Sequence, residues 1–191
     1  MIKIDEFIKS LKKNDLNFFT GVPDSLLRDL CFSIDINFKK NHIVAANEGS
    51  AIGLAIGYYL KTGKIPIVYL QNSGFGNMIN PILSLADKNV FNIPLLIIMG
   101  WRGEKSKFIK DEPQHKTQGA LTEILLKKLN IRYRIITKNS NISKNIKELK
   151  NYSKKKNKIS CLLIKKNVFK KNNLIKKKFS YTELMKREEI L

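Results

Sequence analysis

Glu48 is the only acidic residue in an otherwise apolar or small-residue stretch, residues 42–60. The pattern changes there from a strand-like run to a helix-like run, so Glu48 is expected at the start of a buried helix. Two interpretations are open. Asn47 is a suitable N-cap and the helix dipole favours an acidic first turn, so Glu48 could simply complete a cap. However, burying an unpaired carboxylate is costly, and the apolar neighbours favour a functional carboxylate that shares a proton with a partner.

His115 is a second candidate for chemistry and one of only two histidines. It follows Asp-Glu-Pro-Gln, residues 111–114, in a polar segment that we expect to be a long loop. A histidine in such a loop suits acid–base chemistry or substrate contact, although an isolated histidine is also commonly structural. His42, at the start of a predicted strand, is interpreted as structural.

The elements that must position these residues alternate along the chain. Strands are predicted at 17–22, 42–46, 65–71, 93–100, 131–136 and 159–164, and helices at 4–13, 24–34, 48–61, 76–87, 117–129 and 142–153. Several strand runs are continuously apolar, which is typical of strands covered on both faces. Strand–helix alternation indicates a parallel sheet. We therefore predict an α/β fold, with a six-stranded, mainly parallel sheet flanked by helices on both faces.

The unusual residues gather after four of these strands, at the edge where α/β sheets hold their ligands. These segments are TGVPDSLL (20–27), NEGS (47–50), QNSGFGN (71–77) and residues 101–115. Asp24 or Ser25 is expected to cap the helix that follows the first strand. The glycine-rich loop 71–77 lacks both the G-x-G-x-x-G and the P-loop patterns, so it is a weak phosphate-site candidate.

Gly49, Gly53 and Gly57 are spaced four apart, so they share one face of the helix predicted at 48–61. Each glycine weakens a helix by about 1 kcal/mol relative to alanine. Such a bare face indicates that another backbone packs closely against it, either inside the chain or at a subunit interface.

The 191-residue chain carries a formal net charge of +20. Residues 131–191 contain 19 Lys and Arg against 4 Asp and Glu, but no nucleic-acid motif accompanies them, so nucleic-acid binding is disfavoured. No apolar run approaches the roughly 20 residues that span a bilayer, and the N-terminus lacks a signal-peptide pattern. Cys31 and Cys161 have neither zinc nor redox spacing. We expect a cytoplasmic protein without a membrane segment.

Four blocks together resemble the N-terminal, pyrimidine-binding domain of thiamine-diphosphate-dependent decarboxylases. They are residues 18–27, 45–87, 93–104 and 110–119, within roughly the first two thirds of the chain. The pattern is most similar to phosphonopyruvate decarboxylases, and sulfopyruvate decarboxylase α subunits share much of it. The resemblance implies a lyase that releases CO2 from a small anionic 2-oxo acid. Phosphonopyruvate, giving phosphonoacetaldehyde, is the leading substrate, and sulfopyruvate is the alternative.

The resemblance also implies roles for individual residues. Glu48 would hydrogen-bond N1′ of the cofactor's aminopyrimidine ring and favour the tautomer that removes the thiazolium C2 proton. His115 would be an acid–base residue. The other implied positions are Asn72, Gly74, Phe75 and Gly76 against the pyrimidine, and Asp24 and Ser25 at the substrate end. From charge alone, Arg102, with Lys105 or Lys107, is assigned to the phosphonate of the substrate.

One part of the family pattern is missing. These enzymes hold Mg2+ and the diphosphate through a Gly-Asp-Gly segment, and this sequence contains none, so no metal ligand is assigned here. We expect residues 1–166 to form the pyrimidine-binding domain and residues 167–191 to be a basic extension or linker toward an absent diphosphate-binding domain. A separate diphosphate-binding subunit, in a homo- or hetero-oligomer, would complete the enzyme. The alternative is a truncated, inactive binding module.

Overall fold

The computed structural model describes residues 1–104 and 111–170. Its centre is a six-stranded sheet in the order β2-β1-β3-β4-β6-β5, in which every neighbouring pair of strands is parallel. The strands are β1 (Phe19–Gly21), β2 (His42–Val44), β3 (Ile67–Gln71), β4 (Leu96–Gly100), β5 (Arg132–Ile136) and β6 (Ser160–Ile164). The helices are α1 (Ile4–Lys13), α2 (Arg28–Phe38), α3 (Glu48–Thr62), α4 (Phe75–Pro81), α5 (Pro113–Lys128) and α6 (Ile142–Lys156). The predicted α/β fold is confirmed.

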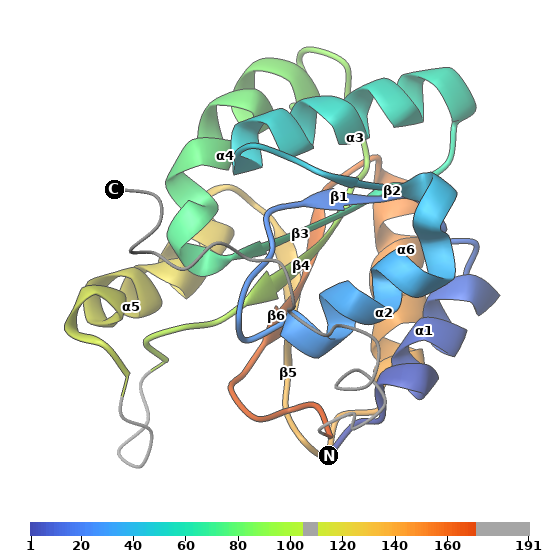
Figure 1. The fold of residues 1–191 in the computed structure, drawn as a ribbon. Coiled ribbons are helices and arrows are strands. Elements are labelled where there is room, and N and C mark those ends of the chain that lie inside the picture. The colour runs from blue at the N-terminus through green and yellow to red at the C-terminus, as the bar shows by residue number, and fades with distance from the viewer. Residues whose placement is uncertain (105–110, 171–191) are drawn as a thin grey trace, which may run out of the picture.

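Helices cover both faces of the sheet (Figure 1). α1, α2 and α6 pack on one face, and α3, α4 and α5 pack on the other. The central strands divide their side chains between the two cores: Ile67 and Tyr69 of β3 enter the first, whereas Val68 and Leu70 enter the second. Because both cores are apolar, the in–out alternation of these strands is hidden in the sequence. The strands with continuous apolar runs are therefore covered on both faces, as predicted.

α2 begins at Arg28, four residues later than predicted. Its N-cap is Leu27, and no side chain caps the helix, so the expectation that Asp24 or Ser25 does so is wrong. The physical reason is that both side chains turn toward the end of β4. Asp24 lies against Gly100, and Ser25 accepts a hydrogen bond from Arg102.

α5 begins at Pro113, four residues earlier than predicted. Proline fits the first turn of a helix because its missing N–H has no helical partner there. His115 consequently lies in the first turn of α5, and the expectation that it sits on a long loop is wrong. The predicted helix 76–87 is also divided, because α4 ends at Pro81 and a π-helical turn, residues 82–86, follows it.

The folded body continues to the last described residues. Val168 is 2% exposed and belongs to the first core, and Phe169 packs edge-on against Phe7 of α1. Backbone hydrogen bonds also join this segment to Ile2. The packed domain thus extends past the predicted boundary at residue 166. No helix in the described ranges is long and apolar enough to cross a membrane.

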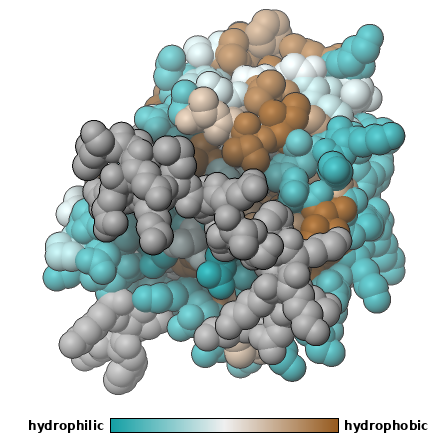
Figure 2. Space-filling view, viewed as in Figure 1, coloured by the Kyte–Doolittle hydropathy of each residue, from teal (hydrophilic) through white to brown (hydrophobic). Residues whose placement is uncertain are grey.

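One side of α3 is exposed within the described part of the chain. Figure 2 shows apolar residues gathered in the upper part of this view, where Figure 1 draws α3. Gly53, Leu54, Gly57 and Leu60 form what we call the exposed α3 face; Leu54 is 39% exposed and Leu60 is 57% exposed. A Cβ at Gly53 or Gly57 would meet nothing within 4 Å, so these two glycines do not serve packing within the described chain.

Candidate functional site

The predicted residues converge at the carboxyl ends of β1 to β4. The loop after β1 carries Asp24 and Ser25, and the first residue of α3 is Glu48. The segment after β3 carries residues 72–76, and the segment after β4 carries Arg102 and leads to His115. Because the carboxyl ends of parallel strands share one edge, these four segments form a single candidate site.

Glu48 is buried, with 8% of its surface exposed. Asn47 is the N-cap of α3 and accepts a hydrogen bond from the Ser50 N–H at 2.8 Å, so the helix does not need Glu48 as its cap. Glu48 Oε2 accepts a hydrogen bond from Asn77 Nδ2 at 2.8 Å. Oε1 has no hydrogen-bond partner among the described residues. The carboxylate is thus anchored through one oxygen and available through the other.

Gly74 provides the space for this carboxylate. A Cβ at position 74 would lie 2.1 Å from Glu48 Oε1 and 2.5 Å from its Cγ. The backbone of Gly74 has φ −78° and ψ 1°, which other residues also adopt. The close approach of Glu48, and not the backbone conformation, is therefore what requires glycine at this position.

Asn72 joins the segments after β3 and β4. It is 3% exposed, and its Nδ2 donates to the carbonyl of Arg102 and to Thr122 Oγ1, both at 2.9 Å. Its Oδ1 accepts from the Arg102 N–H at 2.9 Å. Both amide hydrogens are committed to the chain itself, so the Asn72 side chain acts here as a clamp. Its predicted contact with a cofactor would have to use the backbone or the second lone pair of Oδ1.

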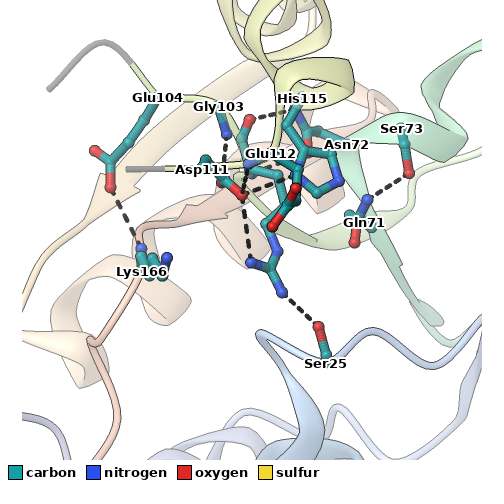
Figure 3. A network of polar contacts seen from close by, with 11 residues as sticks. Ser25, Gln71, Asn72, Ser73, Gly103, Glu104, Asp111, Glu112, His115 and Lys166 are labelled. Carbon is teal, nitrogen blue, oxygen red and sulfur yellow. Dashed lines mark hydrogen bonds and ion pairs between the residues drawn. The ribbon is translucent and has the colours of Figure 1, made fainter. Parts of the chain in front are cut away.

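A polar network lies beside this clamp (Figure 3). Arg102 donates from Nη2 to Ser25 Oγ, and its Nη1 lies 3.6 Å from Asp111 Oδ1. Asp111 Oδ1 also lies 2.8 Å from His115 Nδ1, and Oδ2 accepts from the Gly103 N–H at 2.9 Å. Burial alone would raise the pKa of Asp111, but the hydrogen bonds from Gly103, His115 and Glu112 outweigh it and lower the pKa to about 2. Asp111 is therefore an ionised carboxylate between two basic side chains.

Close backbone contacts fix the position of α5 and hence of His115. Trp101 Nε1 donates to the Gly119 carbonyl at 3.0 Å. Gly103 has φ +67°, and a Cβ there would lie 1.8 Å from the His115 carbonyl oxygen. A Cβ at Gly119 would lie 1.9 Å from the Gly103 carbonyl oxygen. Two glycines thus let the first turns of α5 touch the segment after β4.

Asp24 is 6% exposed, and neither of its carboxyl oxygens makes a hydrogen bond with a described residue. Burial raises its pKa above the ordinary value of 3.8, while nearby backbone N–H groups and Arg102 only partly oppose the rise. A buried acid without a partner is unfavourable for folding, which is typical of a group retained for function.

The residues present fit one end of thiamine diphosphate. Glu48 Oε1 makes no hydrogen bond with a described residue, and it occupies space that a Cβ at residue 74 would fill. This oxygen is suited to accept a hydrogen bond from a protonated ring nitrogen. Phe75 packs in the second core, and a Cβ at Gly76 would meet nothing within 4 Å. No group of three or more His, Cys, Asp or Glu that could hold a metal ion occurs in residues 1–104 and 111–170. Lys105 and Lys107 lie outside the described residues.

Sequence reasoning missed three residues of the site: Asn77, Asp111 and Thr122. Asn77 and Thr122 carry no signal in the sequence, because their partners lie far away along the chain. Asp111 had a usable signal. It precedes His115 by four residues and lies two residues before the proline in the first turn of α5, so its side chain can reach back to the first turn, where His115 lies.

The same edge of this parallel sheet carries the buried Glu48 carboxylate, which has one oxygen without a hydrogen bond to a described residue, and the Asp111–His115 pair. Residues 4–128 match the family described as "Thiamine pyrophosphate enzyme, N-terminal TPP binding domain". The chain belongs to this family.

Curated relatives are decarboxylases. Phosphonopyruvate decarboxylase of Streptomyces viridochromogenes is 32% identical over 71% of this chain and 33% of its own length. Sulfopyruvate decarboxylase subunit alpha of Methanocaldococcus jannaschii is 38% identical over 50% of this chain and 54% of its own length. The corresponding subunit of Methanococcus maripaludis is 34% identical over 65% of this chain and 71% of its own length. The chain thus matches about a third of the phosphonopyruvate enzyme. In fold it is similar to benzoylformate decarboxylase of Polynucleobacter necessarius, with a TM-score of 0.66, 19% identity, and coverage of 86% of this chain and 30% of that one.

Proposed function

We propose that this chain supplies the pyrimidine-binding half of a cytoplasmic, thiamine-diphosphate-dependent decarboxylase for a small 2-oxo acid with a second anionic group. Phosphonopyruvate, yielding phosphonoacetaldehyde and CO2, is the leading substrate, and sulfopyruvate is the alternative. The main support is Glu48, whose Oε2 is anchored by Asn77 while its Oε1 is left for a ligand. The names of the relatives support the same chemical class.

When bound, thiamine diphosphate supplies the electron sink for loss of CO2. Glu48 would hold a nitrogen of the pyrimidine ring through Oε1, with Asn77 keeping the carboxylate oriented. The backbone of residues 72–76 would lie against the ring. His115 would exchange a proton with the reacting substrate, and the nearby Asp24 would act at the same end of the site as a buried acid.

The second anionic group of the substrate has a candidate location. A cavity of about 210 Å³ is lined by three basic residues, Arg28, Arg102 and Lys166, by Ser25, and by one acidic residue, Asp29, which pairs with Arg28 at 3.4 Å. Arg28 is 68% exposed, whereas Arg102 is 18% exposed, so Arg102 would contribute the less solvent-screened charge. A phosphonate or sulfonate in this cavity would lie next to the loop that carries Asp24. We propose that Arg102 contacts the second anionic group of the substrate in this cavity.

Mg2+ and the diphosphate would be held by a second, diphosphate-binding domain. The described residues offer no metal-binding group, and the exposed α3 face leaves apolar surface and two open glycines uncovered. A contiguous exposed apolar surface is typical of an interaction site. We therefore propose that a partner chain packs closely against this face.

The test begins with the tagged chain purified from its own host together with the chains that associate with it. With thiamine diphosphate and Mg2+ added, we expect CO2 release from phosphonopyruvate or sulfopyruvate. Glu48→Gln should lower turnover by at least about 10²-fold, because the amide cannot share a proton in the same way. Absence of CO2 release from both acids would favour the inactive binding module, and a Glu48→Gln enzyme with wild-type turnover would contradict the role of Glu48.

The anion cavity has a separate test. Arg28→Gln should raise KM for the anionic substrate while leaving the KM for pyruvate, which lacks the second anionic group, unchanged. Lys127→Gln, on the exposed side of α5, removes the same charge elsewhere and is the matched control. Equal KM changes in the two variants would assign the effect to overall charge and contradict the cavity assignment.

A further inference from the structure

Asp111 lies just before α5 and accepts hydrogen bonds at both of its carboxylate oxygens. Oδ2 accepts from the Gly103 N–H at 2.9 Å, and Oδ1 accepts from the Glu112 N–H at 3.0 Å. His115 Nδ1 lies 2.8 Å from the same Oδ1. Only 10% of the Asp111 side chain is exposed, so these contacts are little screened by water.

This geometry determines which nitrogen of His115 carries a proton. A backbone N–H can only donate, so both carboxylate oxygens must act as acceptors. The low pKa of Asp111 means that it has no proton to give. Nδ1 of His115 must therefore be the donor in this contact, and in the neutral ring Nε2 is left without a proton. No described residue forms a hydrogen bond with Nε2.

We propose that Asp111 is a positioning residue, which fixes the orientation and tautomer of His115 so that Nε2 is the atom that exchanges protons with the substrate. The inference rests on the proposed function, because it assigns the reacting atom of a residue in that site. Arg102 supports the arrangement, since its guanidinium lies 3.6 Å from Asp111 and keeps positive charge beside the carboxylate.

A purely structural role for Asp111 is the competing explanation, because two of its bonds tie the start of α5 to Gly103 and Glu112. Loss of those bonds would lower stability whether or not His115 is involved. The decisive readout must therefore report on the imidazole ring itself.

Nitrogen-15 NMR of the full chain gives this readout. The protein has only two histidines, so His42→Gln identifies the His115 signals. At about pH 8.5, where a histidine ring is ordinarily neutral, the wild-type His115 should show a proton on Nδ1 and none on Nε2. In Asp111→Asn a single amide oxygen cannot serve both backbone donors and the ring, so the proton should move to Nε2. Asp35→Asn is the control for removal of a carboxylate beside a histidine: Asp35 is 59% exposed and lies 3.2 Å from His42 Nδ1, so its replacement should leave the His115 tautomer unchanged.

Kinetics of the assembled enzyme give a second readout. Asp111→Asn should lower kcat by about 10- to 100-fold with KM changed far less, by analogy with groups that orient a reactive ligand. Because Asp111 is proposed to act through His115, Asp111→Asn should cause little further loss in a His115→Gln enzyme.

A wild-type His115 with its proton on Nε2 would overturn the proposal without any variant, and so would additive kinetic losses. An unchanged His115 tautomer in a folded Asp111→Asn chain would show that the residue is only structural. The NMR result is independent of turnover. If the tautomer shifts as expected but the wild-type enzyme decarboxylates neither acid, the proposed function fails while the control of His115 by Asp111 stands.

Discussion

Replacement of Gly74 by alanine should displace the Glu48 carboxylate without removing it. A Cβ at this position would lie 2.1 Å from Oε1, 2.2 Å from Cδ and 2.5 Å from Cγ of Glu48. Since ordinary contacts between such atoms are about 3.5 Å or longer, the carboxyl group must move by roughly 1 Å or more. The backbone at Gly74 tolerates alanine, so the effect isolates the position of the carboxylate.

The expected cost follows from the bond that this movement breaks. The hydrogen bond from Asn77 to the Glu48 carboxylate is worth about 1.5–3 kcal/mol. Alanine also lowers the conformational entropy of the unfolded chain, which raises the free energy of unfolding by about 0.4–1 kcal/mol. The free energy of unfolding should fall by about 0.5–2.6 kcal/mol, or about 1–10 °C in Tm for a chain of this size. Turnover should fall by about 10²-fold, because a displacement of about 1 Å is that costly in an active site.

Thermal unfolding followed by circular dichroism and CO2 release by the assembled enzyme measure these two effects. Gly57→Ala in α3 is the matched stability control, because its Cβ would meet nothing within 4 Å. It should raise the free energy of unfolding by about 0.5–1 kcal/mol. In a Glu48→Ala chain, the alanine at 74 has space, and its cost should disappear. Wild-type Tm and turnover in Gly74→Ala would refute the reasoning.

Two further predictions concern the α3 face and the buried acid. Gly53→Phe should leave the Tm of the isolated chain at or above the wild-type value, since a Cβ there would meet nothing within 4 Å. The same variant should prevent assembly with the partner, measured by size-exclusion chromatography. Unchanged assembly would place the interface elsewhere. Asp24→Asn should raise Tm at pH 7. The folded-state pKa of Asp24 is raised, so the wild type loses stability as pH rises above about 4, whereas the amide does not, and the difference should vanish at lower pH. A Tm difference that does not depend on pH would contradict the assignment of a buried, destabilising acid.

The sequence predicted those features that depend on local composition. The strands β3, β4 and β6 are apolar on both faces, so their runs are visible and their positions were predicted to within a few residues. Asn47 was predicted as a cap from its residue type, and it caps α3. The clustering of the four loops followed from the parallel sheet alone.

Features set by tertiary contact could not be predicted in this way. The first turn of α5 is polar, so its start at Pro113 gives no apolar periodicity, and His115 was expected in a loop. Asp24 and Ser25 looked like helix caps because that is their local preference. In the structure Asp24 packs against Gly100 without a hydrogen bond, and Ser25 accepts one from Arg102. Gly74 was predicted only as part of the glycine-rich loop 71–77, whereas the structure shows that the side chain of Glu48 is what excludes a larger residue there.

The Asn72 side chain has a consequence for assembly. It ties the end of β3, the segment after β4 and α5 into one rigid body through three hydrogen bonds. The conformational entropy of arranging these segments is therefore lost when this chain folds, and not when a partner or ligand arrives. Association then avoids the ordering cost that usually subtracts from affinity, so a modest interface suffices for tight binding. The candidate site is therefore preorganised for the second chain that we propose.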